Sequence, residues 1–136
     1  MTRDRFLILF LRLVGTVAGL AVFCVAMPYA WMDATHRFLG MGALPDAPIV
    51  GYLARSTSAF YAMLGGLFWV MSCDLSRYRP LLRYVGLAIM LLGVALTVID
   101  HLEGLPLFWQ AGEGPFDAAI GAVILFLARS VKEKHP

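Results

Sequence analysis

Three long, mainly apolar runs constrain this chain more than any other feature of its sequence. Crossing about 30 Å of hydrocarbon at about 1.5 Å per residue takes roughly 20 apolar residues in a helix, because lipid offers no partner to an unpaired backbone group. The runs that reach this length are Phe6 to Met27, Val50 to Cys73 and Leu81 to Ile99. Hydrophobic residues make up 60% of the chain and charged residues 15%, so the excess apolar surface must face something other than water. The sequence therefore predicts an integral membrane protein in contact with the lipid bilayer.

A fourth and weaker run lies near the carboxyl end. After Asp117, only Ala118 to Ala128 is free of charge, which is about 17 Å at helical rise and too short to cross a bilayer unaided. Gly114 and Pro115 predict a helix start, because proline suits the first helical turn, and Asp117 would then face the positive end of the helix. We expect this helix to cover about residues 115–131, with Asp117 either at the outer interface or shielded from lipid by neighbouring helices.

The distribution of Lys and Arg over the loops predicts the orientation, because basic residues collect on the cytoplasmic side of membrane proteins. One side carries Arg3, Arg5, Arg12, Arg77, Arg79, Arg83, Arg129, Lys132 and Lys134. The opposite side carries only Arg37 and Arg55, together with most of the acids. Both termini are therefore expected in the cytoplasm.

These observations predict an all-α, integral membrane four-helix bundle made of a single domain, residues 1–136, with spans at about 6–27, 50–73, 81–99 and 115–131. The tight hairpin around Asp74 to Pro80 predicts that the second and third helices are antiparallel neighbours. In the first outer loop, Asp33 is expected to cap a short interfacial helical segment from Ala34 to Leu39.

Small residues recur at helical spacing, namely Gly15 and Gly19, Ala62 and Gly66, and Gly86 and Gly93. Such positions let helix backbones approach closely where lipid removes the hydrophobic driving force. Packing inside the bundle is the favoured interpretation, and a face for a second copy of the chain is the alternative.

Arg55 is the most unusual residue of the predicted spans. It lies about 10 Å into the second helix on the acidic side, followed by a polar face from Ser56 to Ser58. An ionisable group at this depth is costly, so a partner is expected. Its candidate partners are Asp100, Glu113 and Asp117. A buried ion pair is the favoured interpretation, and the alternatives are a pocket for an anionic substrate or headgroup and a side chain that snorkels to the interface.

Histidines and acids also gather on the outer side of the predicted bundle. His36, His101 and Glu103 are candidate ligands of zinc or a similar divalent ion. They come from separate loops without a recognised ligand spacing, so solvated loop residues are the favoured interpretation. No catalytic or phosphate-binding motif is recognised, so no cofactor is predicted and a function other than catalysis is the favoured interpretation. The net charge of +2, without a basic stripe, argues against nucleic acid.

The segments from Asp74 to Pro80 (Asp-Leu-Ser-Arg-Tyr-Arg-Pro) and from Glu113 to Pro115 resemble those of small, uncharacterised four-helix bacterial inner-membrane proteins, similar in size and layout to the DoxX-like group. The resemblance implies a bacterial inner membrane and a four-helix fold. It implies no activity and no site residue.

Three functions are compatible with the sequence. The leading hypothesis is a small accessory or structural subunit that packs against other membrane proteins or further copies of itself. The second is a carrier or binding protein for an anionic or lipid-like molecule, with Arg55 as the charge anchor and Asp117 as its counter-ion. The third is an outer metal or redox site that includes His36 and His101.

Overall fold

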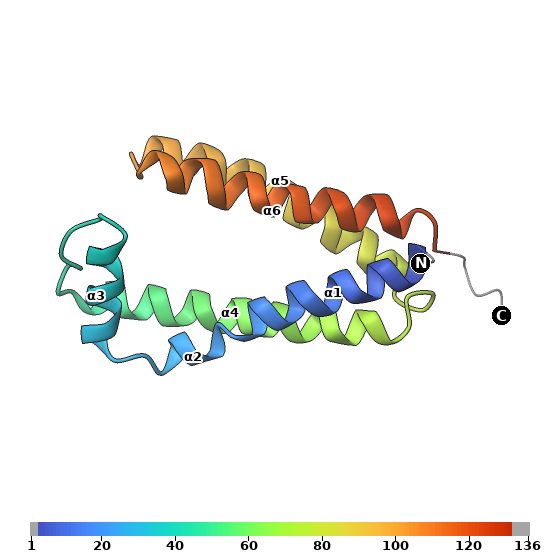
Figure 1. Cartoon of the computed structure of the whole chain (residues 1–136), viewed down its shortest axis with the longest axis horizontal. Helices are drawn as coiled ribbons and strands as arrows, with labels where there is room; N and C mark the ends of the chain where they lie inside the picture. Colours follow the sequence, from blue (N-terminus) through green and yellow to red (C-terminus); the bar gives the residue numbers. More distant parts are fainter. Residues whose placement is uncertain (1–2, 132–136) are drawn as a thin grey trace. The chain divides into compact units, whose positions relative to one another are not determined.

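A computed structural model describes residues 3–131, and every regular element in this range is a helix (Figure 1). The elements are α1 (Arg3–Gly19), α2 (Val22–Val25), α3 (Tyr29–Phe38), α4 (Pro48–Cys73), α5 (Arg79–Leu102) and α6 (Leu107–Ala128). The chain divides into two compact units, the first made of residues 1–10 and 71–136 and the second of residues 11–70. Each unit is described on its own.

The predicted all-α class is confirmed, and three helical segments within the described residues are long and apolar enough to cross a membrane. They are Arg3–Val25, Arg79–Leu102 and Leu107–Ala128. The predicted second span also forms a continuous helix, α4, of 26 residues. Its amino-terminal half carries Arg55 and the polar run Ser56 to Ser58, and α4 is not among these three segments.

The predicted start of the last helix at Pro115 is wrong, because α6 begins at Leu107 and contains Pro115 in its interior. Pro106 ends the preceding turn in an extended conformation (φ −55°, ψ 144°), and its carbonyl accepts hydrogen bonds from the amides of Trp109 and Gln110. The helix therefore has 22 residues and is about 33 Å long, enough to cross a bilayer. Asp117 lies in its middle and not in its first turn.

Two other predicted boundaries also differ from the structure. The first apolar run is not one helix, because α1 ends at Gly19 and a turn separates it from α2. The helical segment of the first outer loop begins at Tyr29 after Pro28, and not at Ala34. Asp33 consequently lies inside α3 and does not cap it.

The α5–α6 hairpin of the first unit is held together by a seam of glycines (Figure 1). A Cβ added at Gly93 would lie 2.3 Å from the backbone nitrogen of Ala118, and one at Gly121 would lie 2.6 Å from the carbonyl oxygen of Gly86. Gly114 lies against Thr97 in the same way. The backbones approach this closely only because these positions lack side chains, so the predicted role of Gly86 and Gly93 inside the molecule is confirmed.

A four-residue connection from Glu103 to Pro106 joins these two helices, and Gly104 makes it possible. The amide of Gly104 donates to the carbonyl of His101, and the amide of Leu105 donates to the carbonyl of Asp100. This Schellman arrangement requires a left-handed residue, and Gly104 has φ +69°. The chain therefore reverses at once and α5 and α6 are antiparallel.

In the second unit, α1 crosses α4 at a close contact between glycines. A Cβ added at Gly65 would lie 2.5 Å from the carbonyl oxygen of Gly15 and 2.5 Å from the amide nitrogen of Gly19. Beside the crossing, the indole nitrogen of Trp69 donates to the hydroxyl of Thr16 over 3.2 Å. Gly15 and Gly19 thus pack inside the unit as predicted. Their partner on α4 is Gly65, and the predicted packing role of Gly66 is wrong, because a Cβ added there would meet nothing within 4 Å.

Candidate functional site

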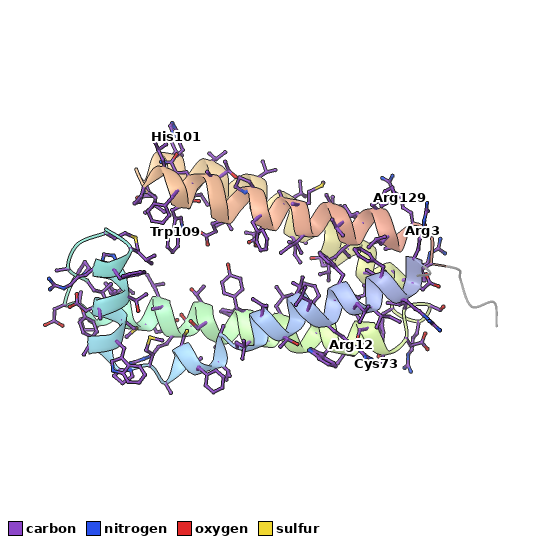
Figure 2. The ribbon with its side chains drawn as sticks, viewed as in Figure 1. Arg3, Arg12, Cys73, His101, Trp109 and Arg129 are labelled. Atoms are coloured by element: carbon purple, nitrogen blue, oxygen red, sulfur yellow. The ribbon has the colours of Figure 1, made fainter. Side chains whose placement is uncertain are left out.

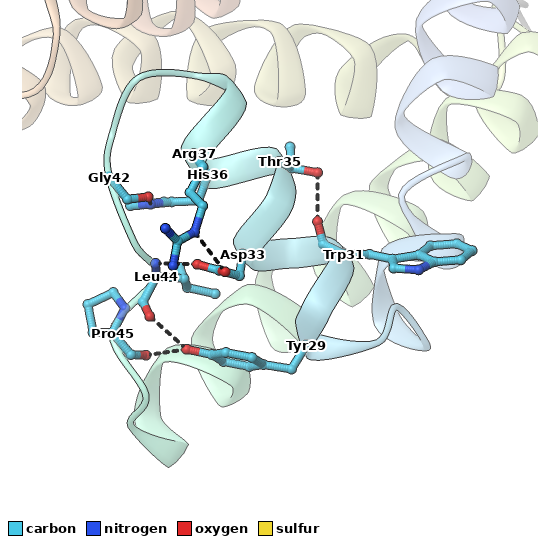
Figure 3. A network of polar contacts seen from close by, with 9 residues as sticks. All are labelled: Tyr29, Trp31, Asp33, Thr35, His36, Arg37, Gly42, Leu44 and Pro45. Carbon is cyan, nitrogen blue, oxygen red and sulfur yellow. Dashed lines mark hydrogen bonds and ion pairs between the residues drawn. The ribbon is translucent and has the colours of Figure 1, made fainter.

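The connection between α2 and α4 contains a compact polar network around α3 (Figure 3). One carboxylate oxygen of Asp33 accepts the backbone amide of Leu44 over 2.7 Å, and the other pairs with Arg37 over 2.9 Å. The hydroxyl of Tyr29 donates to the carbonyl oxygens of Leu44 and Pro45, at 3.0 and 2.6 Å. These bonds fold the segment that follows α3 back against that helix.

The network shifts the pKa of two of its groups. The hydrogen bond from the Leu44 amide, aided by Arg37, lowers the pKa of Asp33 below its ordinary value. Desolvation, with the nearby charges of Asp46 and Asp33, raises the pKa of Tyr29. Asp33 therefore stays ionised and Tyr29 stays a hydrogen-bond donor at neutral pH, the states in which both hold the loop.

His36, a predicted metal candidate, belongs to the same loop. Its Nδ1 lies 2.9 Å from the carbonyl oxygen of Gly42, so one ring nitrogen already has a backbone partner. A ring bonded in this way fixes the position of the loop that follows α3.

The second group of predicted polar residues lies at the end of the α5–α6 hairpin marked by His101 and Trp109 (Figure 2). Nδ1 of His101 lies 3.4 Å from Oε1 of Gln110, whose amide nitrogen donates to the carbonyl oxygen of Leu105 over 2.6 Å. The indole nitrogen of Trp109 donates to the carboxylate of Glu113. His101 and Glu113 are therefore each bound to a residue of the first turn of α6.

Asp100 differs from these residues because it is buried, with 3% of its surface exposed. Its Oδ2 has no hydrogen-bond partner among the described residues. Leaving a buried polar atom without a partner costs about 1–3 kcal/mol, which makes this oxygen a candidate acceptor for a further donor. Asp117 is half-buried on α6. It follows Glu113 by one helical turn, so these two acids lie on the same face of α6.

Arg55 lies in the second unit, exposed on α4, and its Nη2 donates to the carbonyl oxygen of Met27 over 3.3 Å. The predicted pairing of Arg55 with Asp100, Glu113 or Asp117 stays a prediction, because those acids belong to the first unit. Within its own unit, the guanidinium of Arg55 is bound to a backbone oxygen and not to a carboxylate.

Residues 3–131 contain no group of three or more His, Cys, Asp or Glu side chains that could hold a metal ion. Glu103, the third predicted metal candidate, is exposed at the end of α5. The geometry gives the metal or redox hypothesis no support, and that hypothesis stays a prediction.

Sequence reasoning missed Gln110, which links His101 to the turn between α5 and α6. The available signal was Pro106, since a proline before an apolar run also suits the position preceding a helix. With the helix start placed there, Gln110 falls in the first turn, beside the end of α5.

No protein-family model matches this chain, and neither does any curated protein or solved structure. The resemblance to DoxX-like proteins therefore stays a prediction.

Proposed function

We propose that the chain is a multi-pass protein of the bacterial inner membrane that acts as a small accessory subunit, packed against other membrane proteins. In this proposal α4 is a fourth span, since its 26 residues extend about 39 Å, and the arginine-rich ends of the spans face the cytoplasm. The three apolar helical segments support the membrane location.

The observation that carries the proposal is the polar face of α4 around Arg55. Its guanidinium and the neighbouring Thr57 are exposed, and the bond to the Met27 carbonyl leaves other guanidinium donors available. A charged group within a span costs about 2.5–3.5 kcal/mol or more when it faces lipid. Contact with a polar surface of another membrane protein removes that cost, so this face is the proposed subunit interface.

Purification of the full chain in a mild detergent, followed by native mass spectrometry, tests the proposal. The wild-type chain is expected to carry a partner subunit, and Arg55→Ala is expected to weaken the complex by about 2–5 kcal/mol, as for a desolvated charge at an interface. Arg37→Ala is the matched control, because Arg37 is an exposed arginine of the same unit that pairs within α3. A solitary wild-type monomer, or equal losses in both variants, would contradict the proposal.

A further inference from the structure

The end of the α5–α6 hairpin opposite to the Gly104 turn carries a groove of about 540 Å³. It is lined by Arg83, Tyr84, Leu87 and Met90 of α5 and by Leu125 and Arg129 of the α6 side. This volume lies within the range of about 300–1,000 Å³ that is usual for ligand sites. The groove belongs wholly to the first unit and contains none of the residues of the candidate functional site.

The antiparallel register brings the two arginines of the groove to the same level. Gly86 lies against Leu125, since a Cβ added at Gly86 would be 3.0 Å from its Cγ atom. Arg83 precedes Gly86 by about one turn and Arg129 follows Leu125 by about one turn, so antiparallel helices place both guanidinium groups side by side. Within residues 3–131, no hydrogen bond or ion pair to the guanidinium of Arg83 or Arg129 is found.

Two guanidinium groups at one level repel each other. An anion between them is attracted to both, and this attraction offsets their repulsion. Phosphate is well suited, because its oxygens accept the paired N–H donors of arginine. The hydroxyl of Tyr84, which is 69% exposed, adds a further donor beside Arg83.

Next to this cationic end, the floor of the groove is apolar. Leu87 and Leu125 lie one helical turn from the arginines and Met90 lies one turn further, and Leu87 is 45% exposed. A small soluble anion would leave these side chains uncovered. An anionic phospholipid matches this arrangement, because its phosphate group is followed by hydrocarbon chains just as the two arginines are followed by apolar side chains.

We propose that the Arg83–Arg129 groove binds an anionic phospholipid, with its phosphate between the two arginines and an acyl chain along Leu87, Met90 and Leu125. A third arginine lies at the same end of α6 (Figure 2). It is Arg3, whose Nη1 donates to the hydroxyl of Ser130 over 3.0 Å and whose guanidinium lies 5.8 Å from the centre of the Phe126 ring. It adds positive charge while staying bound to protein.

Native mass spectrometry of the full chain with added dioleoyl phosphatidylglycerol or dioleoyl phosphatidylcholine tests this site. The wild-type chain is expected to retain the anionic lipid in preference to the zwitterionic one. Each of Arg83→Gln and Arg129→Gln should weaken that binding about fivefold, the usual effect of one basic residue near a lipid surface. Arg77→Gln removes one positive charge from the loop before α5 and is the charge-matched control. Equal binding of both lipids, or equal losses in all three variants, would overturn the proposal.

A second pair of variants tests the apolar floor. Leu87→Ser is expected to weaken phosphatidylglycerol binding, whereas Leu91→Ser, an exposed leucine of α5 outside the groove, should leave it unchanged. Glycerol phosphate, which has the charged group without acyl chains, should not displace the lipid at equal concentration. Displacement at that concentration would identify a site for soluble phosphate esters and would overturn the assignment to a lipid. Circular dichroism of each variant separates a lost site from a lost fold.

Discussion

The two units of the molecule bring their helices together by different means. In the first unit, Gly86 and Gly93 of α5 face Gly121 and Gly114 of α6 at seven-residue spacing, so the seam runs over several turns. In the second unit, the close glycine contact of α1 and α4 is at Gly65, and the connection around α3 is held by hydrogen bonds of partly exposed groups. A side chain added in the seam of the first unit would therefore disturb close backbone contacts over more of the helix length than one added at the Gly65 crossing.

The largest effect is therefore expected in the seam. In Gly93→Ala the new Cβ would lie 2.3 Å from the Ala118 nitrogen and 2.5 Å from the Gly114 oxygen, both backbone atoms. The helices must separate, and contacts along the seam weaken together. We expect the free energy of unfolding to fall by about 1–3 kcal/mol, measured by titration with a denaturing detergent.

Gly112→Ala is the matched control on α6, because a Cβ at Gly112 meets nothing within 4 Å. Alanine has the higher helix propensity, so this variant should be as stable as the wild-type chain or more stable by up to about 1 kcal/mol. If Gly93→Ala proved no less stable than Gly112→Ala, the seam would not hold the hairpin together.

A smaller effect is expected at the crossing of the second unit, where two adjacent glycines can be compared. Gly65→Ala places a Cβ 2.5 Å from the backbone of both Gly15 and Gly19, whereas Gly66→Ala places one in open space. We expect Gly65→Ala to lower the free energy of unfolding by about 1 kcal/mol and Gly66→Ala to leave it unchanged or higher. The same detergent titration measures both, and a larger loss than that of Gly93→Ala would reverse the comparison between the units.

Much of the helix content could be predicted from the sequence, because apolar runs in lipid must be helical. The boundaries could not, since they depend on local competition between residues. Both Pro106 and Pro115 suit a helix start, and the hydrogen bonds of the Pro106 carbonyl to Trp109 and Gln110 decide between them. Likewise, Gly65 and Gly66 are adjacent residues of the same type, and only the rotation of α4 about its axis determines which of them faces α1.

The candidate sites were less predictable for the same reason. Asp33 and His36 could be identified as neighbouring polar residues, but their partners are the backbone groups of Leu44 and Gly42, which no spacing rule specifies. Arg83 and Arg129 lie together because of the antiparallel register of α5 and α6. That register could not be predicted while the start of α6 was placed at Pro115.

The smallest expected effect concerns the polar connection of the second unit and depends on pH. The pKa of Asp33 is lower in the folded loop than its ordinary value of 3.8. A lowered pKa means that the folded loop favours the ionised form of Asp33. The contribution of this carboxylate to the stability of the loop is therefore complete above about pH 4 to 5, and it is lost as the pH falls through the folded pKa. Acid should therefore loosen the loop while the glycine seam of the first unit, which has no titratable group, keeps its contacts.

The backbone amide of Leu44 reports this change directly, because its partner is the Asp33 carboxylate. Its hydrogen-exchange protection, corrected for the intrinsic pH dependence of exchange, should be constant from pH 7 to pH 5 and should decrease below about pH 4. Asp33→Asn keeps an oxygen acceptor without a titrating charge, so protection in this variant should be weaker at pH 7 and independent of pH. A wild-type profile as flat as that of Asp33→Asn would show that the ionised carboxylate does not hold the loop, and the contrast between an apolar seam and a polar connection would then fail.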